Sequence, residues 1–213
     1  MKIVCISDTH EKHRQLKLPV GDILIHAGDY TWVGHSGPTL DFIDWFEDQP
    51  FKHKITVCGN HDFYFEDNHH LDVLAGRKLN FLMNESLQID NHVKIWGSPY
   101  TPRFMDWAFM AGSEKIAAIW ANIPEGLDIL ITHGPPFGIL DRTVRGDHVG
   151  CPELLKAVQA KKPKIHVFGH IHEGYGIVER GGTIFVNASI CDEMYSLANE
   201  PVVLDLNESS LDL

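Results

Sequence analysis

The segment at residues 165–172 reads Ile165-His166-Val167-Phe168-Gly169-His170-Ile171-His172, a mostly apolar β-forming run that leads straight into a glycine and two histidines. Four other polar blocks follow β-forming runs in the same way, and they are Asp8-Thr9-His10, Gly28-Asp29, Gly59-Asn60-His61-Asp62 and His133-Gly134. An open α/β sheet gathers its ligand sites at the carboxyl ends of its strands. We therefore expect these five blocks to meet at one place in the fold.

Length and composition indicate a single soluble domain over residues 1–213. A chain of 213 residues is long enough for one sizeable core and too short for two comfortable ones. No apolar run approaches the roughly 20 residues of a membrane helix, and the N-terminus enters a strand with no room for a signal peptide. We therefore expect a cytoplasmic protein without membrane contact.

The formal charge of -11 bears on the partners of the protein. It argues against a non-specific nucleic-acid binder, which needs a basic face, so no duplex nucleic acid is expected as a partner. Part of this charge fits a metal-binding cluster, because two divalent cations would reduce it by four. The four cysteines form no CxxC pair, and we expect free thiols rather than a structural disulfide.

Periodicity and turn residues predict an α/β fold. Helices are expected from Pro38 to before Pro50, over 68–75, over 114–121 with Ser113 as its cap, and from Pro152 to before Pro163. Besides the five strands that precede the polar blocks, hairpins are expected at 79–97, turning at Asp90-Asn91, and at 175–187, with a last edge strand at 201–206. Helices and strands alternate early and hairpins dominate late, so we predict two mixed sheets packed together with helices outside.

Each block taken alone is weak evidence for a metal site. An Asp-x-His pair or a Gly-Asp at a strand end is typical of a turn, and an isolated His133 fits a buried core histidine equally well. In extended chain, however, alternate residues share a face, so His170 and His172 can form a chelate, and Asp8-x-His10 can project two ligands to one side. Five such blocks in this order favour a pair of divalent metal ions and hydrolytic chemistry.

The order of the blocks resembles the calcineurin-like metallophosphoesterase superfamily, whose pattern is D-x-H, G-D, G-N-H-[DE], a single His near G-H, and G-H-x-H. Every element is present, and the local departure is Thr132, where a glycine often precedes the fourth-block histidine. A closer resemblance, over nearly the whole chain, is to the brain-type metallophosphoesterase-domain proteins and their microbial relatives, which are similar to class III cyclic nucleotide phosphodiesterases. It rests on Trp96-Gly97-Ser98-Pro99-Tyr100, Asp106-Trp107-Ala108-Phe109, Thr132-His133-Gly134-Pro135-Pro136, Val149-Gly150-Cys151 and residues 166–176. It implies a four-layer αββα sandwich.

The resemblance also implies roles for the block residues. One divalent metal ion would be held by Asp8, His10, Asp29 and His172, and a second by Asp29, Asn60, His133 and His170, with Asp29 as the bridging carboxylate. A metal-bridging hydroxide would attack phosphorus in line, with His61 as the general acid for the leaving oxygen. Asp62 is expected either to orient His61 or to cap a turn. Mixed His, Asp and Asn ligation suits manganese, iron or zinc, and we favour manganese.

The resulting hypothesis is a dinuclear phosphodiesterase for small phosphodiesters, and the resemblance implies cyclic nucleotides as the natural class. A phosphomonoesterase or protein phosphatase of the same fold and a non-catalytic metal-binding scaffold stay as alternatives, and the oligomeric state is not indicated. Loop residues that can reach a phosphate or base are Arg103, Arg142, Arg145 and His148, and rings that can stack on a base are Tyr30, Trp32, Phe104 and Trp107. Solvated loop charges and core packing are the competing interpretations of these residues.

Overall fold

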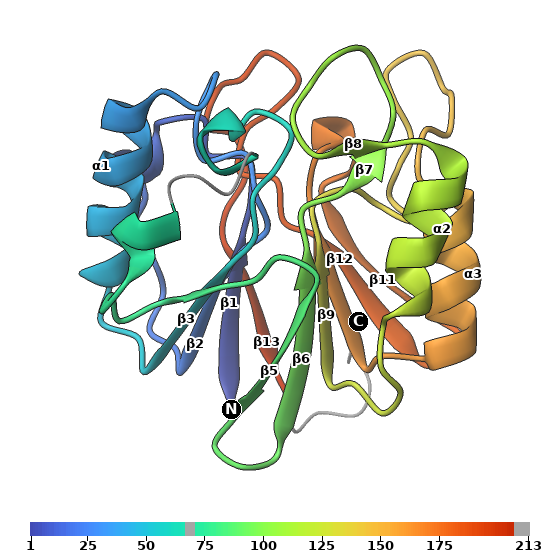
Figure 1. The fold of residues 1–213 in the computed structure, drawn as a ribbon, viewed down its shortest axis with the longest axis horizontal. Coiled ribbons are helices and arrows are strands. Elements are labelled where there is room, and N and C mark those ends of the chain that lie inside the picture. The colour runs from blue at the N-terminus through green and yellow to red at the C-terminus, as the bar shows by residue number, and fades with distance from the viewer. Residues whose placement is uncertain (67–70, 207–213) are drawn as a thin grey trace.

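Two β-sheets lie face to face in the centre of the molecule, with helices outside both of them (Figure 1). The computed structural model describes residues 1–66 and 71–206. The helices are α1 (Ser36–Glu47) beside the first sheet, and α2 (Ser113–Ala121) and α3 (Pro152–Lys161) beside the second. Short 3₁₀ turns are η1 (His13–Gln15), η2 (Phe63–Phe65), η3 (Leu71–Leu74) and η4 (His172–Gly174). The predicted α/β class with an αββα arrangement is confirmed.

The first sheet has the strand order β13-β1-β2-β3-β4. Its parallel members are β1 (Lys2–Ile6), β2 (Ile23–His26), β3 (His53–Thr56) and β4 (Asn80–Phe81), and β13 (Val202–Asp205) pairs antiparallel with β1. The predicted edge strand near the C-terminal end therefore returns to the first strand of the chain. The polar blocks after β1, β2 and β3 all leave the sheet at its carboxyl edge.

The second sheet has the order β11-β12-β10-β9-β6-β5. Parallel pairing joins β6 (Val93–Ser98), β9 (Ile129–Thr132), β10 (Ile165–Phe168) and β12 (Thr183–Asn187), while β5 (Glu85–Ile89) and β11 (Gly176–Arg180) close its edges as hairpin partners. A small separate pair is formed by β7 (Thr101–Pro102) and β8 (Met110–Ala111). A parallel bridge between Ser7 and Ser189 links the first and second sheets where their polar blocks emerge.

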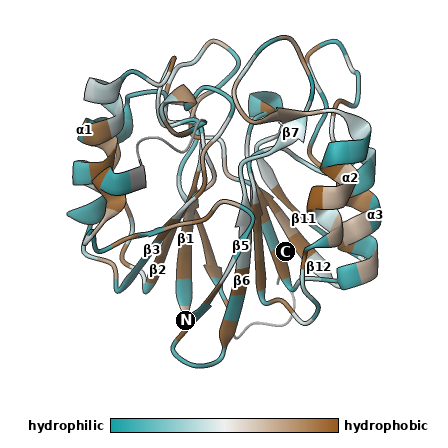
Figure 2. Ribbon diagram, in the orientation of Figure 1, coloured by the Kyte–Doolittle hydropathy of each residue, from teal (hydrophilic) through white to brown (hydrophobic). Residues whose placement is uncertain are grey.

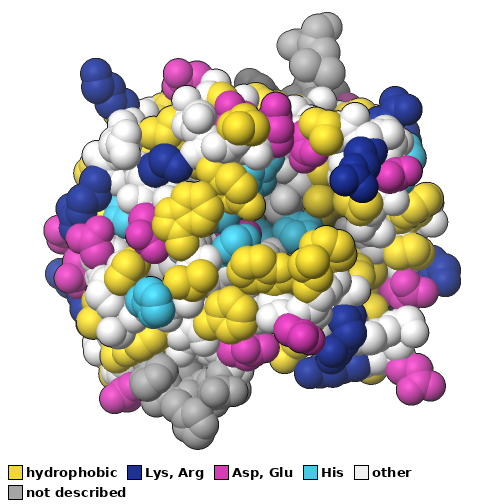
Figure 3. Space-filling view, turned by 90° about the horizontal axis from the view of Figure 1, so that it is seen from above, with side chains coloured by type: hydrophobic (Ala, Val, Ile, Leu, Met, Phe, Trp, Pro, Cys, Tyr) yellow, Lys and Arg dark blue, Asp and Glu magenta, His cyan; other side chains and the backbone are white. Residues whose placement is uncertain are grey.

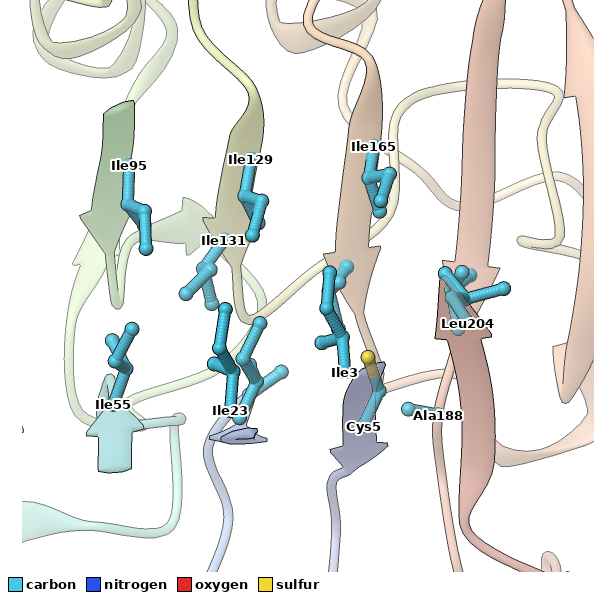
Figure 4. Packing of buried hydrophobic residues seen from close by; sticks show 14 of the residues in the cluster. Ile3, Cys5, Ile23, Ile55, Ile95, Ile129, Ile131, Ile165, Ala188 and Leu204 are labelled. Carbon is cyan, nitrogen blue, oxygen red and sulfur yellow. The ribbon is translucent and has the colours of Figure 1, made fainter. Parts of the chain in front are cut away.

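Alternation along the strands builds three apolar layers between the four layers of structure. Ile3 and Cys5 face the space between the sheets, where they meet Ile129 and Ile131 of the opposite sheet (Figure 4). The alternate residues of each strand face the opposite side of their sheet. Leu130, which lies between Ile129 and Ile131 in the chain, therefore packs in the cluster that includes residues of α2 and α3. The central strands are therefore largely hydrophobic, as expected of sheets covered on both faces, whereas the edge strands β5 and β11 and the helices are mixed (Figure 2). This rigid core fixes the positions from which the polar blocks project.

The helix ends differ in detail from the sequence predictions. Helix α1 begins at Ser36 rather than Pro38, which lies in the first turn, where a helix leaves its N–H groups unpaired in any case. Gly112, not Ser113, is the N-cap of α2, and because glycine has no side chain the helix begins without a side-chain capping bond. The predicted 68–75 helix lies partly outside the described residues, and the described part is the 3₁₀ turn η3.

All four cysteines are free and buried, which confirms the expectation that the chain has no structural disulfide. Cys151 has a specific role at the start of α3, where its Sγ accepts hydrogen bonds from Leu154 N and Trp120 Nε1, both at 3.4 Å. Burial raises the pKa of this thiol, so it stays protonated near neutral pH. No helix among the described residues is long and apolar enough to span a bilayer.

Candidate metal centre

Three of the five polar blocks leave their strands through strained backbone. Asp8, His10, Asp29 and His170 have φ angles of 53°, 39°, 58° and 68°, all in the left-handed region. Such conformations cost about 1–3 kcal/mol each and persist only where the surrounding structure imposes them, often at functional sites. The extended geometry expected for the Asp8-x-His10 and His170-x-His172 pairs is therefore wrong.

Because the chain turns at His170, the two histidines of its block do not form a chelate with one another. His172 lies in a first group with Asp8 and His10, and His170 lies in a second group with Asp29 and His133. Within each of these groups the candidate ligand atoms are all within 4.8 Å of one another. The turn thus divides one sequence block between two neighbouring sites.

In the first group two imidazole nitrogens face each other. His10 donates its Nδ1–H to the Thr31 carbonyl at 3.2 Å, and His172 donates its Nδ1–H to the Asp192 carbonyl at 2.8 Å. This fixes the tautomer of each ring in its neutral form, in which both Nε2 atoms carry a lone pair although they lie only 3.4 Å apart. The His172 Nε2 is also 3.4 Å from Asp8 Oδ1. Two lone pairs and a carboxylate oxygen directed at one point need a cation or a proton between them.

The second group repeats this arrangement. His133 donates its Nδ1–H to the Ala27 carbonyl at 2.9 Å, so that its Nε2 faces Asp29 Oδ2 at 3.2 Å and Asn60 Oδ1 at 2.9 Å. The Asn60 amide oxygen is an acceptor like the carboxylate. Three acceptors again converge, and hydrogen bonds from the outer ring nitrogen to main-chain carbonyls are the usual way in which proteins orient metal-ligating histidines.

The ionisation of the two carboxylates reflects these contacts. Burial opposes ionisation of Asp8, yet the hydrogen bond and charge of His172 outweigh it and hold the pKa of Asp8 well below its ordinary value. The charge and hydrogen bond of His133 likewise overcome burial and lower the pKa of Asp29. Both carboxylates are therefore charged at neutral pH.

The histidines divide according to their distance from these carboxylates. Burial opposes protonation, but Asp29 raises the pKa of His133 to about 9, and Asp8 raises that of His172 to about 9. His170 lacks such a close partner, and burial lowers its pKa to about 4. Each group thus holds one proton that a divalent cation would displace, so the donor set and its charge fit a metal in both places.

His61 borders both groups. Its ring donates Nδ1–H to the Trp32 carbonyl at 2.6 Å and places Nε2 4.0 Å from Asp29 Oδ2, while its backbone N–H donates to Asp29 Oδ1 at 2.8 Å. The ring also belongs to a third potential ligand group, with His10 and Asp29. His61 is therefore within reach of whatever Asp29 binds.

The hydrogen bonds of Asp62 go to the turn backbone and to Thr31 rather than to the His61 ring, as in the alternative of a turn residue. Its Oδ2 accepts hydrogen bonds from Asp29 N and Gly59 N, and its Oδ1 accepts from the backbone and the hydroxyl of Thr31, at 2.7–3.0 Å. Burial, reinforced by the charge of Asp29, raises the pKa of Asp62 to about 7. Asp62 ties two of the polar blocks together at their backbones.

Two glycines of the blocks are required by close packing. A Cβ on Gly169 would lie 2.0 Å from Asp8 Oδ2, and a Cβ on Gly59 would lie 2.2 Å from Asp29 Oδ1. Real Cβ atoms do not approach other atoms so closely. Glycine at these positions therefore lets the backbone pass directly beside the two carboxylates.

Two residues that contribute to the site, Ser189 and Tyr195, were missed in the sequence. Ser189 donates its hydroxyl to Asp8 Oδ2 at 2.8 Å, and the Tyr195 ring lies 4.9 Å from the His10 ring and 5.1 Å from the His172 ring, centroid to centroid. Ser189 follows β12 as the other blocks follow their strands, so its position was a usable signal. Tyr195 carried none, because it lies in a loop without a motif.

The suggested substrate-contacting residues separate into two sets. Tyr30 belongs to the core: it is buried and stacks on Phe42 with ring centroids 4.1 Å apart, so the expectation that it can stack on a base is wrong. The ring centroid of Trp107 lies 4.3 Å from that of His61, and the ring centroid of Trp32 lies 5.0 Å from that of His10. Three of the other suggested residues line one cavity, and they are Arg103, Arg145 and His148, together with the ring of Phe104. Arg142 instead donates its Nε–H to the Gly146 carbonyl within its own loop.

The fold and this pair of ligand groups define a metallophosphoesterase. The family model for calcineurin-like phosphoesterases matches residues 1–174, and the chain belongs to that family. The family binds divalent metals, and membership in it indicates a metal-dependent hydrolase.

Individual relatives agree with this family assignment. The chain is 38% identical over 230 residues to metallophosphoesterase domain-containing protein 1 of Homo sapiens, covering 96% of this chain and 71% of that protein. It is 36% identical over 227 residues to a UPF0046 protein of Caenorhabditis elegans, covering 97% and 81% of the two chains. The crystal structure of TT1561 of Thermus thermophilus superposes with a TM-score of 0.64 at 13% identity, over 99% of this chain and 96% of that one, and supports the fold.

Proposed function

We propose that the protein is a dinuclear metal-dependent phosphodiesterase that hydrolyses small phosphodiesters. The observation that carries this proposal is the convergence of histidine ring nitrogens and charged carboxylates at two adjacent points, with the rings of His10, His133 and His172 each held by a main-chain carbonyl. Such a donor set has no use in a protein that merely needs a stable core, because every one of these groups is costly to bury unpaired.

The ligands divide as the groups do. Asp8, His10 and His172 would hold one ion and Asn60, His133 and His170 the other, with Asp29 shared between them. Of the two Asp29 oxygens, Oδ2 faces His133 and Oδ1 accepts the His61 N–H. Imidazole with carboxylate and amide oxygens is a set that manganese, iron and zinc accept, and we propose manganese as the preferred ion.

Two divalent ions in these positions would activate a water molecule and neutralise the charge that develops on the phosphoryl oxygens. In its doubly protonated form His61 would supply the proton for the leaving oxygen from Nε2, while its Nδ1–H stays hydrogen-bonded to the Trp32 carbonyl. Asp62 would keep the Asp29 and Gly59 backbones in register, and so keep His61 beside the reacting phosphate. No covalent intermediate on the protein is needed.

Preference for diesters over monoesters is supported by the space beside the second group. A cavity of about 800 Å³ opens next to His170, which is far more than a phosphate requires. A diester has a second ester arm that can occupy this space, whereas a monoester has only an extra charge. Cyclic nucleotides, which the family resemblance implies, are one class of small diester that would fit.

The test is a comparison of two substrates on metal-restored protein. Protein stripped with a chelator should be inactive, and addition of Mn²⁺, Fe²⁺ or Zn²⁺ in turn should restore hydrolysis, most strongly with Mn²⁺. We expect kcat/KM for bis-p-nitrophenyl phosphate to exceed that for p-nitrophenyl phosphate. A higher value for the monoester would replace the proposal by a phosphomonoesterase, and no hydrolysis of either by metal-loaded protein would favour a binding scaffold.

A further inference from the structure

The cavity beside His170 is lined largely by apolar side chains. It lies between Arg103-Phe104, which follow β7, and the 134–150 loop, which follows β9. Apolar side chains supply much of its lining, among them Phe104, Phe137, Val144 and Val149. In the view onto this face, hydrophobic side chains surround the histidines of the metal centre (Figure 3).

These four apolar side chains are exposed to solvent. Phe104 is 63% exposed and Phe137 is 42% exposed. Among the described residues, the exposed large hydrophobic side chains lie in loops at the carboxyl ends of the strands, with the exceptions of Val20 and Val203. Single exposed apolar residues need no explanation, but a cluster around a cavity next to reactive groups is characteristic of a ligand site.

The buried carboxylate of Asp141 fixes the position of one polar side chain in the cavity wall, that of His148. Asp141 is fully buried, and its Oδ2 accepts the N–H groups of Gly138 and Gly150 at 2.8 and 2.9 Å, near the two ends of the loop segment that it holds together. Its Oδ1 accepts the Nδ1–H of His148 at 2.6 Å. A Cβ on Gly150 would lie 2.8 Å from Asp141 Oδ2, so the loop closes tightly around this carboxylate.

The contact with Asp141 determines what His148 can offer. With Nδ1 donating to the carboxylate, Nε2 of the neutral ring is an acceptor, and it has no hydrogen-bond partner within residues 1–66 and 71–206. The side chain of His148 is 45% exposed, lines the cavity, and lies beside the Phe137 ring with centroids 5.8 Å apart. The wall therefore presents one oriented acceptor next to aromatic surface.

We propose that this cavity binds the second ester arm of the substrate, that it selects a flat apolar arm over a small alkyl arm, and that His148 accepts a hydrogen bond from an N–H or O–H group on the edge of that arm. This rests on the proposed phosphodiesterase function and adds its substrate specificity. Phe104 and Phe137 would cover the faces of the arm. His148 would be a specificity-determining residue and not part of the bond-breaking chemistry.

The first experiment varies the arm while the leaving group stays the same. Metal-loaded protein is assayed with methyl p-nitrophenyl phosphate and phenyl p-nitrophenyl phosphate. Burial of a phenyl arm should lower KM by about tenfold or more relative to methyl, at the usual gain per unit of apolar area. Phe104→Ala should raise KM for the phenyl ester by about tenfold, leave KM for the methyl ester within about twofold, and leave kcat unchanged. Val20→Ala removes an exposed apolar side chain at the amino end of β2 and should change neither KM.

The second experiment tests His148 with an arm that carries a donor. The wild type should prefer the 4-aminophenyl ester to the phenyl ester by about fivefold in KM, as for one ordinary hydrogen bond. His148→Phe keeps the contact with Phe137 and should abolish this preference, while His148→Gln should retain part of it.

Equal KM values for methyl and phenyl esters, or a Phe104→Ala effect of the same size on both, would overturn the cavity proposal while the proposed function stands. An aminophenyl preference that persists in His148→Phe would overturn the role of His148. Absence of hydrolysis of every diester by metal-loaded wild type would instead refute the proposed function and this inference with it.

Discussion

Replacing His61 with alanine should slow the cleavage of poor leaving groups without removing metal. The His61 side chain is 10% exposed, and its Nε2 lies 4.0 Å from Asp29 Oδ2, at the edge of both ligand groups. Truncation removes the proton donor but leaves the carboxylates and the other histidines in place. The lost hydrogen bond to the Trp32 carbonyl lies at the partly exposed edge of the site, so the fold should be preserved.

The size of the effect follows from the role of a general acid. Proton transfer to the leaving oxygen typically contributes ~10²–10⁴-fold, which is about 3–5 kcal/mol of barrier at 1.36 kcal/mol per tenfold. We expect a loss of that order in kcat for methyl phenyl phosphate, whose phenolate leaves poorly. For methyl p-nitrophenyl phosphate, whose leaving group is much less basic and needs little protonation, the loss should be below about tenfold.

The assay measures kcat for both esters, and metal content by mass spectrometry, in the wild type, His61→Ala and a matched control. His92→Ala is that control, because the exposed His92 ring makes the same type of hydrogen bond, from Nδ1 to the Asp90 carbonyl at 2.6 Å, far from any ligand group. Equal losses on the two esters would refute the acid role. Loss of a metal ion from His61→Ala would instead make His61 a ligand, as its proximity to His10 and Asp29 allows.

Three further outcomes are expected. Gly169→Ala should weaken Mn²⁺ binding by about tenfold or more in calorimetry, because the added Cβ would displace Asp8. Gly37→Ala, whose Cβ would meet open space, should bind Mn²⁺ as the wild type does. An unchanged Mn²⁺ affinity in Gly169→Ala would contradict the close packing of Gly169 against Asp8. Mn²⁺ binding to stripped protein at pH 7.5 should release about two protons, one from His133 and one from His172, because the pKa of each is about 9. Calorimetry in buffers of different ionisation enthalpy measures this release, and release of no protons would show that both rings are already neutral. Burial lowers the pKa of His166 to about 3 from an ordinary value of about 6.5, so the unfolded chain takes up this proton before the folded one does. The free energy of unfolding should therefore fall as pH drops from about 6.5 towards 3, by up to about 1.4 kcal/mol per pH unit. In urea unfolding, His166→Leu should show a weaker dependence of this free energy on pH, and an identical dependence would exclude His166 as its cause.

The sequence predicted the elements and the meeting of the blocks because these depend on simple periodicities. Strand runs such as 129–131 are apolar on both faces, which is what a covered parallel sheet requires, and their carboxyl ends must then share an edge. The turn at Asp90-Asn91 was also readable, since both residues adopt the left-handed conformation that Asp and Asn tolerate.

The local direction of the side chains was not predictable in the same way. Asp62 ends one block and Tyr30 follows another, yet Asp62 binds backbone N–H groups and Tyr30 packs on Phe42. His170 and His172 were read as an extended pair, but a positive φ at His170 divides them between the two groups. These outcomes depend on long-range packing of loops from different strands, which spacing along one segment does not encode.

The central claim, that two divalent ions share Asp29, is tested most directly by metal stoichiometry. Wild-type protein, stripped with a chelator, reloaded with Mn²⁺ and freed of excess by gel filtration, should contain two ions per chain by mass spectrometry. Asp29→Asn should lose most of both ions, while Asp48→Asn, at a carboxylate beyond the end of α1 and away from both ligand groups, should keep two. One ion or none in the wild type, or two ions retained in Asp29→Asn, would contradict the account.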